Sequence, residues 1–119
     1  MKPPLKVDVV DSVFDLESDD KTIQKKQVDA KDLYRVFLYL KGLDVPLVRS
    51  VVYYLHTTFR PQTHRVSRTP DNPTAKLVIW TWGTFVVRAD IEDIEGVVTK
   101  VTHQLTWDAE VDPRKVKLS

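Results

Sequence analysis

Three aromatic side chains lie within six consecutive residues, in the segment Trp80-Thr81-Trp82-Gly83-Thr84-Phe85. On an extended strand, side chains two residues apart share a face, so Trp80 and Trp82 point the same way. An aromatic residue beside a glycine at a strand end can form the wall of a ligand slot, because glycine allows a turn or a close backbone approach. It can also form a buried corner, and these residues alone favour that interpretation, since aromatic side chains mostly bury for packing.

A second cluster combines polar and aromatic groups in the segment Leu55-His56-Thr57-Thr58-Phe59-Arg60-Pro61. Alternation directs His56 and Thr58 to one side and Phe59 to the other, until the loop interrupts the period. An imidazole and a hydroxyl beside an aromatic ring can line a pocket with a few placed hydrogen-bonding groups. The alternative is a histidine that caps the strand end with one hydrogen bond, and the cluster alone favours that alternative.

Both clusters lie near the ends of segments that have the period-two pattern of half-buried antiparallel strands. β-Branched and aromatic residues dominate this pattern in residues 33–41, 48–56, 84–91 and 97–105. Further strands are predicted over about 5–16, 63–68 and 75–82, whereas Lys21 to Lys31 is compatible with either an extended segment or a short helix. Seven or eight strands with turns every 8–12 residues predict an all-β fold, an immunoglobulin-like antiparallel β-sandwich. We expect residues 1–119 to form a single domain, with a polar tail over 108–119 that frays.

Composition excludes several kinds of chemistry. The 119 residues contain no cysteine, which excludes disulfides, thiol catalysis and cysteine-ligated metals. The three histidines lack the close spacing of a metal-ligand motif, and no serine lies in a nucleophile elbow, so we expect no metal, no cofactor and no enzymatic activity. Apolar runs are too short to span a membrane, and no signal peptide begins the chain, so we expect a cytoplasmic protein.

Charged residues are nearly balanced, with 18 Lys and Arg against 17 Asp and Glu. This balance argues against bulk phosphate binding. The basic residues Arg60, His64, Arg65, Arg68 and Lys76 are therefore interpreted as a solvated loop and strand edge rather than as a nucleic-acid groove. The acidic residues between Asp8 and Asp20 are likewise interpreted as a solvated loop.

Taken together, these segments resemble the YEATS domain. The run Val51-Val52-Tyr53-Tyr54-Leu55-His56-Thr57-Thr58-Phe59 is similar to the family's V-x-F-x-L-H-x-S-F strand, and Trp82-Gly83-Thr84-Phe85 is similar to its G-W-G-E-F turn. Upstream, Leu33 to Gly42 is similar to the family's W-x-V-x-V-R-G strand. The resemblance covers about residues 28–107 and is greatest to the prokaryotic branch, pYEATS. It implies an immunoglobulin-like β-sandwich, in agreement with the strand pattern.

The resemblance also implies a ligand site at one end of the sandwich. Trp82 and Phe59 would form two aromatic walls, Phe85 would back the slot, His56 would shape it, and Thr58 would stand where a serine hydroxyl binds the acyl amide. Backbone groups of Trp82 and Gly83 would add hydrogen bonds. Three positions depart from the family pattern, since Thr58 replaces the serine, Thr81 replaces the first glycine of the turn, and Thr84 replaces its glutamate.

The resulting hypothesis is a non-enzymatic recognition or sensor module in a prokaryotic signalling or defence context. Its ligand would be an acylated lysine on a protein, or another small planar acyl ligand. The alternative is a structural or protein–protein interaction domain in which the slot is closed, Trp82 and Phe59 belong to the core, and exposed residues such as Phe37 and Tyr39 form the working surface. Exposure of Trp82 discriminates between the two.

Overall fold

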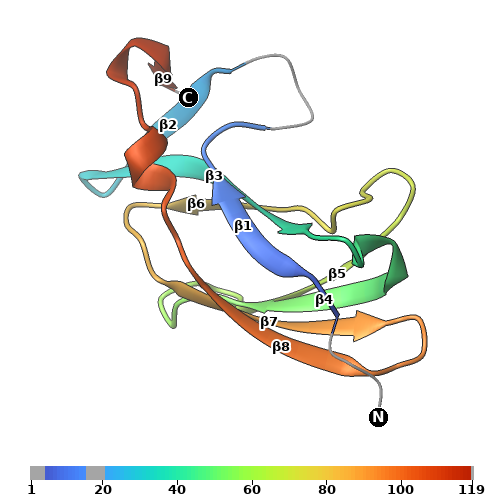
Figure 1. Cartoon of the computed structure of the whole chain (residues 1–119). Helices are drawn as coiled ribbons and strands as arrows, with labels where there is room; N and C mark the ends of the chain where they lie inside the picture. Colours follow the sequence, from blue (N-terminus) through green and yellow to red (C-terminus); the bar gives the residue numbers. More distant parts are fainter. Residues whose placement is uncertain (1–4, 16–20, 119) are drawn as a thin grey trace.

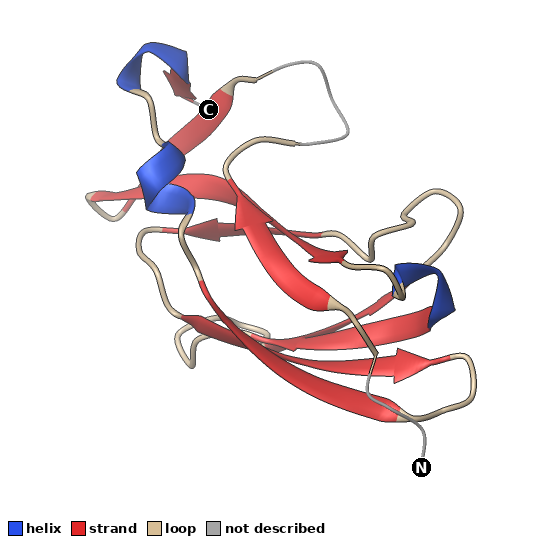
Figure 2. Ribbon diagram, in the orientation of Figure 1, coloured by secondary structure: helices blue, strands red, loops and turns tan. Residues whose placement is uncertain are grey.

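The computed structural model describes residues 5–15 and 21–118, which form two packed β-sheets (Figure 1). One sheet contains β1 (Asp8–Ser12), β2 (Ile23–Val28), β3 (Lys31–Lys41), β6 (Leu77–Thr81) and β9 (Val116–Leu118). The other has the order β5 (Thr63–Ser67), β4 (Val48–Tyr54), β7 (Val86–Asp93) and β8 (Val98–Gln104). Three short 3-10 helices, drawn blue in Figure 2, are η1 (Val45–Leu47), η2 (Trp107–Glu110) and η3 (Pro113–Lys115). The predicted immunoglobulin-like β-sandwich is confirmed.

The central strand of the first sheet is β3, which pairs antiparallel with three neighbours. Its first residues pair with β2, its last residues pair with β1, and β6 pairs along its opposite edge. β2 and β3 are joined by a two-residue turn in which Asp29 and Ala30 have φ of 51° and 65°. Two central residues with positive φ give the turn whose twist matches that of the flanking strands. The segment 21–31, which the pattern left open, is therefore an extended hairpin arm.

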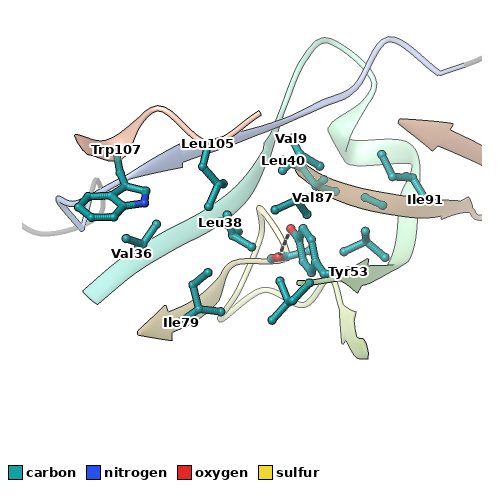
Figure 3. Packing of buried hydrophobic residues seen from close by; sticks show 14 of the residues in the cluster. Val9, Val36, Leu38, Leu40, Tyr53, Ile79, Val87, Ile91, Leu105 and Trp107 are labelled. Atoms are coloured by element: carbon teal, nitrogen blue, oxygen red, sulfur yellow. Dashed lines mark hydrogen bonds between the residues drawn. The ribbon is translucent and has the colours of Figure 1, made fainter. Parts of the chain in front are cut away.

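The core lies between the two sheets and follows the predicted alternation (Figure 3). The inward-facing residues of β3, β4 and β7 are at most 1 % exposed and include Val36, Leu38, Leu40, Val51, Tyr53, Val87, Ala89 and Ile91. Tyr53 carries the one hydroxyl in this set and donates it to the Ala75 carbonyl oxygen at 2.7 Å, the dashed line of Figure 3. The hydrogen bond satisfies a polar group that would otherwise be costly to bury.

Several expectations about the ends and the outer face were wrong. Within the described residues nine strands form rather than seven or eight, because the tail folds back through η2 and η3 and places β9 parallel to β2. β1 is also shorter than the predicted 5–16. Phe37 is only 4 % exposed, because the Arg35 guanidinium and the Lys76 ammonium cover its ring at 5.0 and 5.6 Å. It is therefore not available as an exposed docking residue.

Asp11 is a further correction to the sequence interpretation. Its side chain has no exposed surface, although the acidic segment was interpreted as a solvated loop. Its carboxylate accepts hydrogen bonds from the backbone N–H groups of Thr106 and Trp107, at 2.9 and 2.8 Å. The His103 ring lies 2.6 Å away. The carboxylate thus ties β1 to the chain that leaves β8. Glu17, Asp19 and Asp20, from the same predicted loop, lie outside the described residues.

Candidate functional site

Three connections meet at one end of the sandwich, on the left in Figure 1. They are the β2–β3 turn, the loop from β4 to β5, and the segment from β6 to β7. The second connection carries His56, Thr58 and Phe59, and the third carries Trp82, Gly83 and Phe85. The topology therefore brings the two sequence clusters to a common place, although more than twenty residues separate them.

Internal hydrogen bonds hold the β4–β5 loop in shape. The Leu55 N–H donates to the Gln62 carbonyl at 2.9 Å, and the Gln62 side-chain amide donates to the Leu55 carbonyl at 3.1 Å. Inside the loop, the Phe59 N–H donates to the His56 carbonyl at 3.0 Å. Leu55 itself is buried, so the loop starts from a fixed point of the core. A loop with this many backbone bonds presents its side chains with little ordering left to do on binding.

The two connections enclose a cavity of about 100 Å³, which we call the end slot. All six residues that the sequence singled out line it, together with Thr81 and Thr84, and they are His56, Thr58, Phe59, Trp82, Gly83 and Phe85. The rings of Phe59 and Phe85 lie 5.3 Å apart with their planes at 50°, and the His56 ring lies 6.1 Å from that of Phe85. This is the tilted packing that aromatic quadrupoles favour. The slot is consequently lined by ring surfaces and hydroxyl groups, with no Asp, Glu, Lys or Arg.

His56 and Thr58, both exposed, orient one another in the lining of the slot. The Thr58 backbone N–H points at His56 Nδ1 at 3.2 Å, and Thr58 Oγ1 lies 2.9 Å from the same nitrogen. If His56 Nδ1 accepts the hydrogen bond from the Thr58 backbone N–H, Nδ1 carries no proton. The hydroxyl hydrogen of Thr58 then also points at Nδ1. The lone pairs of Thr58 Oγ1 then remain for an incoming N–H donor. The extra methyl group of threonine, relative to the family's serine, does not prevent this arrangement.

The backbone conformation at Gly83 does not require glycine. Its φ lies outside the left-handed region, and a Cβ added there would meet nothing within 4 Å, so neither the turn nor the surrounding chain requires glycine. Both of its backbone polar groups have partners, since the N–H points at Thr81 Oγ1 at 3.3 Å and the carbonyl accepts from Thr81 Oγ1 at 2.9 Å. Trp107 Nε1 also donates to that carbonyl, at 3.3 Å. The threonine that replaces the family's glycine therefore closes the turn.

Trp82 decides between the open and closed interpretations of the slot. Its side chain is among the exposed large apolar groups, at 60 %, and the Lys31 ammonium lies 4.9 Å from its ring centre. The buried-corner interpretation is thus wrong for Trp82, whereas Phe59 is half-buried against the core. Trp80 lies on the same outer face as predicted and is half-buried beneath the Lys26 ammonium at 4.3 Å.

A larger cavity of about 400 Å³ adjoins the slot, and we call it the flanking groove. It shares Thr58, Phe59, Thr81 and Trp82 with the slot. The rest of its lining comes from the β2–β3 hairpin, the β4–β5 loop and β6, and comprises Val28, Asp29, Lys31, Leu33, Arg60 and Trp80. Sequence reasoning missed this feature. The signal available was weak, because Asp29-Ala30 does not have the glycine that usually marks a two-residue hairpin turn.

The described residues do not assemble the other candidate sites that the sequence offered. Within residues 5–15 and 21–118, no group of three or more His, Asp and Glu side chains is arranged to hold a metal ion. Of the basic stretch, Arg68 donates to the carbonyls of Val48 and Pro46 at 2.8 Å, and Lys76 pairs with Asp15 at 3.3 Å. No helix in the described part of the chain is long and apolar enough to cross a membrane.

Comparisons with known proteins agree with this architecture. The sequence model of one family, described as the prokaryotic YEATS domain, matches residues 34–106. Among solved structures, a Yaf9 YEATS domain recognizing an H3K122suc peptide is 18% identical with a TM-score of 0.58, covering 92% of this chain and 83% of that one. The yeast AF-9 homolog Yaf9 is 15% identical with a TM-score of 0.56, covering 87% and 72% of the two chains. A Yaf9 YEATS domain bound to H3K27ac is 14% identical with a TM-score of 0.54, covering 88% and 78%. The comparison with curated sequences found no match.

Proposed function

This chain belongs to the prokaryotic YEATS domain family, and from that premise we propose that it is a non-enzymatic recognition module. Its end slot binds a small planar acyl amide, and the leading ligand is the side chain of an acylated lysine on a protein. The observation that carries the proposal is the convergence of six residues from two separate loops on one cavity. Solved YEATS domains of similar fold are described as bound to H3K122suc and H3K27ac peptides, which supports the same ligand class here.

The dimensions of the slot favour the tip of a side chain. A volume of about 100 Å³ is roughly that of three water molecules in the liquid, well below the roughly 300–1,000 Å³ of pockets that hold drug-sized ligands. An acyl amide is flat, so it can lie between the Trp82 indole and the Phe59 ring. Its N–H would donate to Thr58 Oγ1, whose lone pairs are available in the tautomer in which His56 Nδ1 accepts the hydroxyl hydrogen. Pairing this donor matters, because an unpaired buried amide costs about 1–3 kcal/mol.

Charge explains why acylation would be required. No carboxylate lines the slot, so an unmodified lysine ammonium would exchange its hydration for aromatic faces and neutral hydroxyls. Partial cation–π compensation is worth about 0.5–2 kcal/mol, less than the cost of removing an ammonium from water. Acylation removes the charge and leaves a group that this lining can satisfy. We propose that the module acts as a single cytoplasmic domain in prokaryotic signalling or defence.

The experiment compares binding of an acetyl-lysine peptide and its unmodified counterpart by isothermal titration calorimetry. We expect the wild type to bind the acetylated peptide alone, and Trp82→Ala to lose at least roughly tenfold in affinity, as for an aromatic anchor. Val98→Ala, exposed on β8 in the other sheet, is the matched control and should bind as the wild type does. Equal affinity of Trp82→Ala and wild type, with the fold intact, would contradict the proposal.

A protein–protein interaction domain without a small ligand is the competing outcome. Acrylamide quenching tests its premise in a variant with Trp80→Phe and Trp107→Phe, which leaves Trp82 as the emitting residue. We expect strong quenching, because Trp82 is exposed. Shielded emission would instead mean that the slot is closed in solution.

A further inference from the structure

The flanking groove is large enough to hold several side chains, and it begins where the end slot ends. Trp82 and Phe59 line both cavities, so the groove is an adjoining surface for a chain whose acyl-lysine enters the slot. The apolar part of the groove comes from Val28, Leu33 and Trp80. Its charged lining residues are two cations, Lys31 and Arg60, and one acid, Asp29, and this positive excess indicates which chain fits.

Three cations lie in or beside the groove. The Lys31 ammonium lies 4.9 Å from the ring centre of Trp82, and the Lys26 ammonium lies 4.3 Å from that of Trp80. Arg60 uses Nη1 to donate to the carbonyls of Thr57 and Phe59, at 2.6 and 3.1 Å, so its guanidinium is held at the rim. Within the part of the chain that the structure describes, none of these three cations forms a salt bridge. Asp29 is the single acid of the lining.

From this charge pattern we infer that the flanking groove selects an acidic segment, in which aspartate or glutamate lies one or two residues from the acylated lysine. The inference rests on the proposed function, because the acyl group fixes the register of the segment. An extended chain advances about 3.3 Å per residue, so residues at these positions would lie along the adjoining groove, which Lys31 and Arg60 line, while the acyl amide occupies the slot. A segment rich in lysine or arginine would bring like charges together and bind more weakly.

A negative charge near the groove can come from the acyl group itself instead of from acidic residues that flank the lysine. The slot has no lysine or arginine in its lining, so a dicarboxylic acyl group such as succinyl would place its carboxylate among neutral side chains. Lys31 lies over Trp82 and Lys26 over Trp80, and the lining of the slot includes neither of them nor Arg60. The structure thus favours a neutral acyl group within an acidic peptide.

The test uses peptides of one length in three contexts, with acidic, neutral or basic residues on both sides of acetyl-lysine. Two further peptides carry unmodified lysine in the acidic context and succinyl-lysine in the neutral context. Exposed ion pairs change affinity by up to about fivefold each, so we expect the acidic acetylated peptide to bind roughly tenfold more tightly than the basic one at low salt. Near 1 M salt, where the Debye length is about 3 Å, the difference should largely vanish.

Variants assign the effect to the groove. Lys31→Glu should reduce the preference for acidic context or reverse it, whereas Lys100→Glu, exposed on β8 in the other sheet, should leave the order of affinities unchanged. Thermal unfolding checks that both variants fold, and the salt dependence of the wild type tests the inference without any variant. Equal affinity in all three contexts would overturn the acidic-partner inference and leave the acyl-lysine proposal standing. An advantage confined to succinyl-lysine would also overturn it. Failure of every acylated peptide to bind would overturn both.

Discussion

Replacing Asp11 with alanine is expected to destabilise the fold and to disturb the end slot from a distance. The carboxylate accepts four hydrogen bonds from chain that is more than ninety residues away. Oδ2 accepts from the backbone N–H groups of Thr106 and Trp107, and Oδ1 faces His103 Nε2 and the Thr106 hydroxyl. Alanine removes all four acceptor interactions and leaves no oxygen in their place.

The magnitude follows from the groups left behind. Each N–H that loses its partner in a buried position costs about 1–3 kcal/mol. The Trp107 N–H is part-buried, whereas the exposed Thr106 N–H can turn to water, so we expect a loss of about 2–3 kcal/mol in the free energy of unfolding, most of it from Trp107. That is a large share of the roughly 5–15 kcal/mol available to a domain. The effect reaches the slot because Trp107 Nε1 holds the Gly83 carbonyl at 3.3 Å.

Urea unfolding followed by far-UV circular dichroism measures the first effect, and the amide resonance of Gly83 reports the second. Asp8→Ala is the matched control, since Asp8 is an exposed aspartate on the same strand. We expect the midpoint to fall sharply for Asp11→Ala alone and the Gly83 resonance to shift or broaden. A loss below about 1 kcal/mol, or a loss equal to that of Asp8→Ala, would refute the argument that Asp11 ties β1 to the end of β8.

Three further predictions concern single residues. Gly83→Ala should change stability by less than about 0.5 kcal/mol, because the added Cβ meets no atom within 4 Å. It should nevertheless weaken acetyl-lysine binding about fivefold or more by narrowing the slot, and unchanged binding would contradict this prediction. Gly42→Ala should destabilise the fold by more than about 2 kcal/mol, since φ is 146° and the added Cβ would lie 2.1 Å from the Lys6 carbonyl oxygen; wild-type stability would contradict this. Burial raises the pKa of Tyr53 far above its ordinary 10.0, so the folded state holds that proton more tightly, and stability should be constant up to about pH 10 and fall above it. Tyr53→Phe should make this alkaline fall smaller, and it should lose about 1 kcal/mol of stability at neutral pH because the hydrogen bond to Ala75 is removed. An unchanged alkaline slope would contradict the assignment.

The fold was largely predictable because each main strand has its own alternating pattern. Leu38 and Leu40 on β3, and Val87 and Ala89 on β7, have the period that their burial requires. The strand β9 was not predictable, because Val116–Leu118 is too short to have a period and its parallel partner β2 lies 93 residues earlier, with Ile23 opposite Val116. The role of Asp11 was missed for a related reason, since the groups that donate hydrogen bonds to its carboxylate are distant in the sequence and only the tertiary fold brings them near.

The candidate site, like the fold, was predictable only in part. Residues alone marked His56, Thr58, Phe59 and the aromatic turn as notable but favoured buried or capping roles, and the resemblance to YEATS domains assembled them into a slot. Whether they bind a ligand stays a prediction. The flanking groove required the position of three loops at once, because Lys31 and Arg60 lie on different segments of the chain and line one cavity only at the end of the sandwich.

The most direct test of the central claim is an amide NMR titration of the labelled domain with acetyl-lysine and crotonyl-lysine peptides, with the unmodified peptide as control. The account predicts saturable shifts for the acylated peptides alone, in residues 56–59, in residues 82–85 and in Lys31 at the groove, and nowhere else. A folded sample that shows no shifts, or shifts confined to the opposite end of the sandwich, would contradict it.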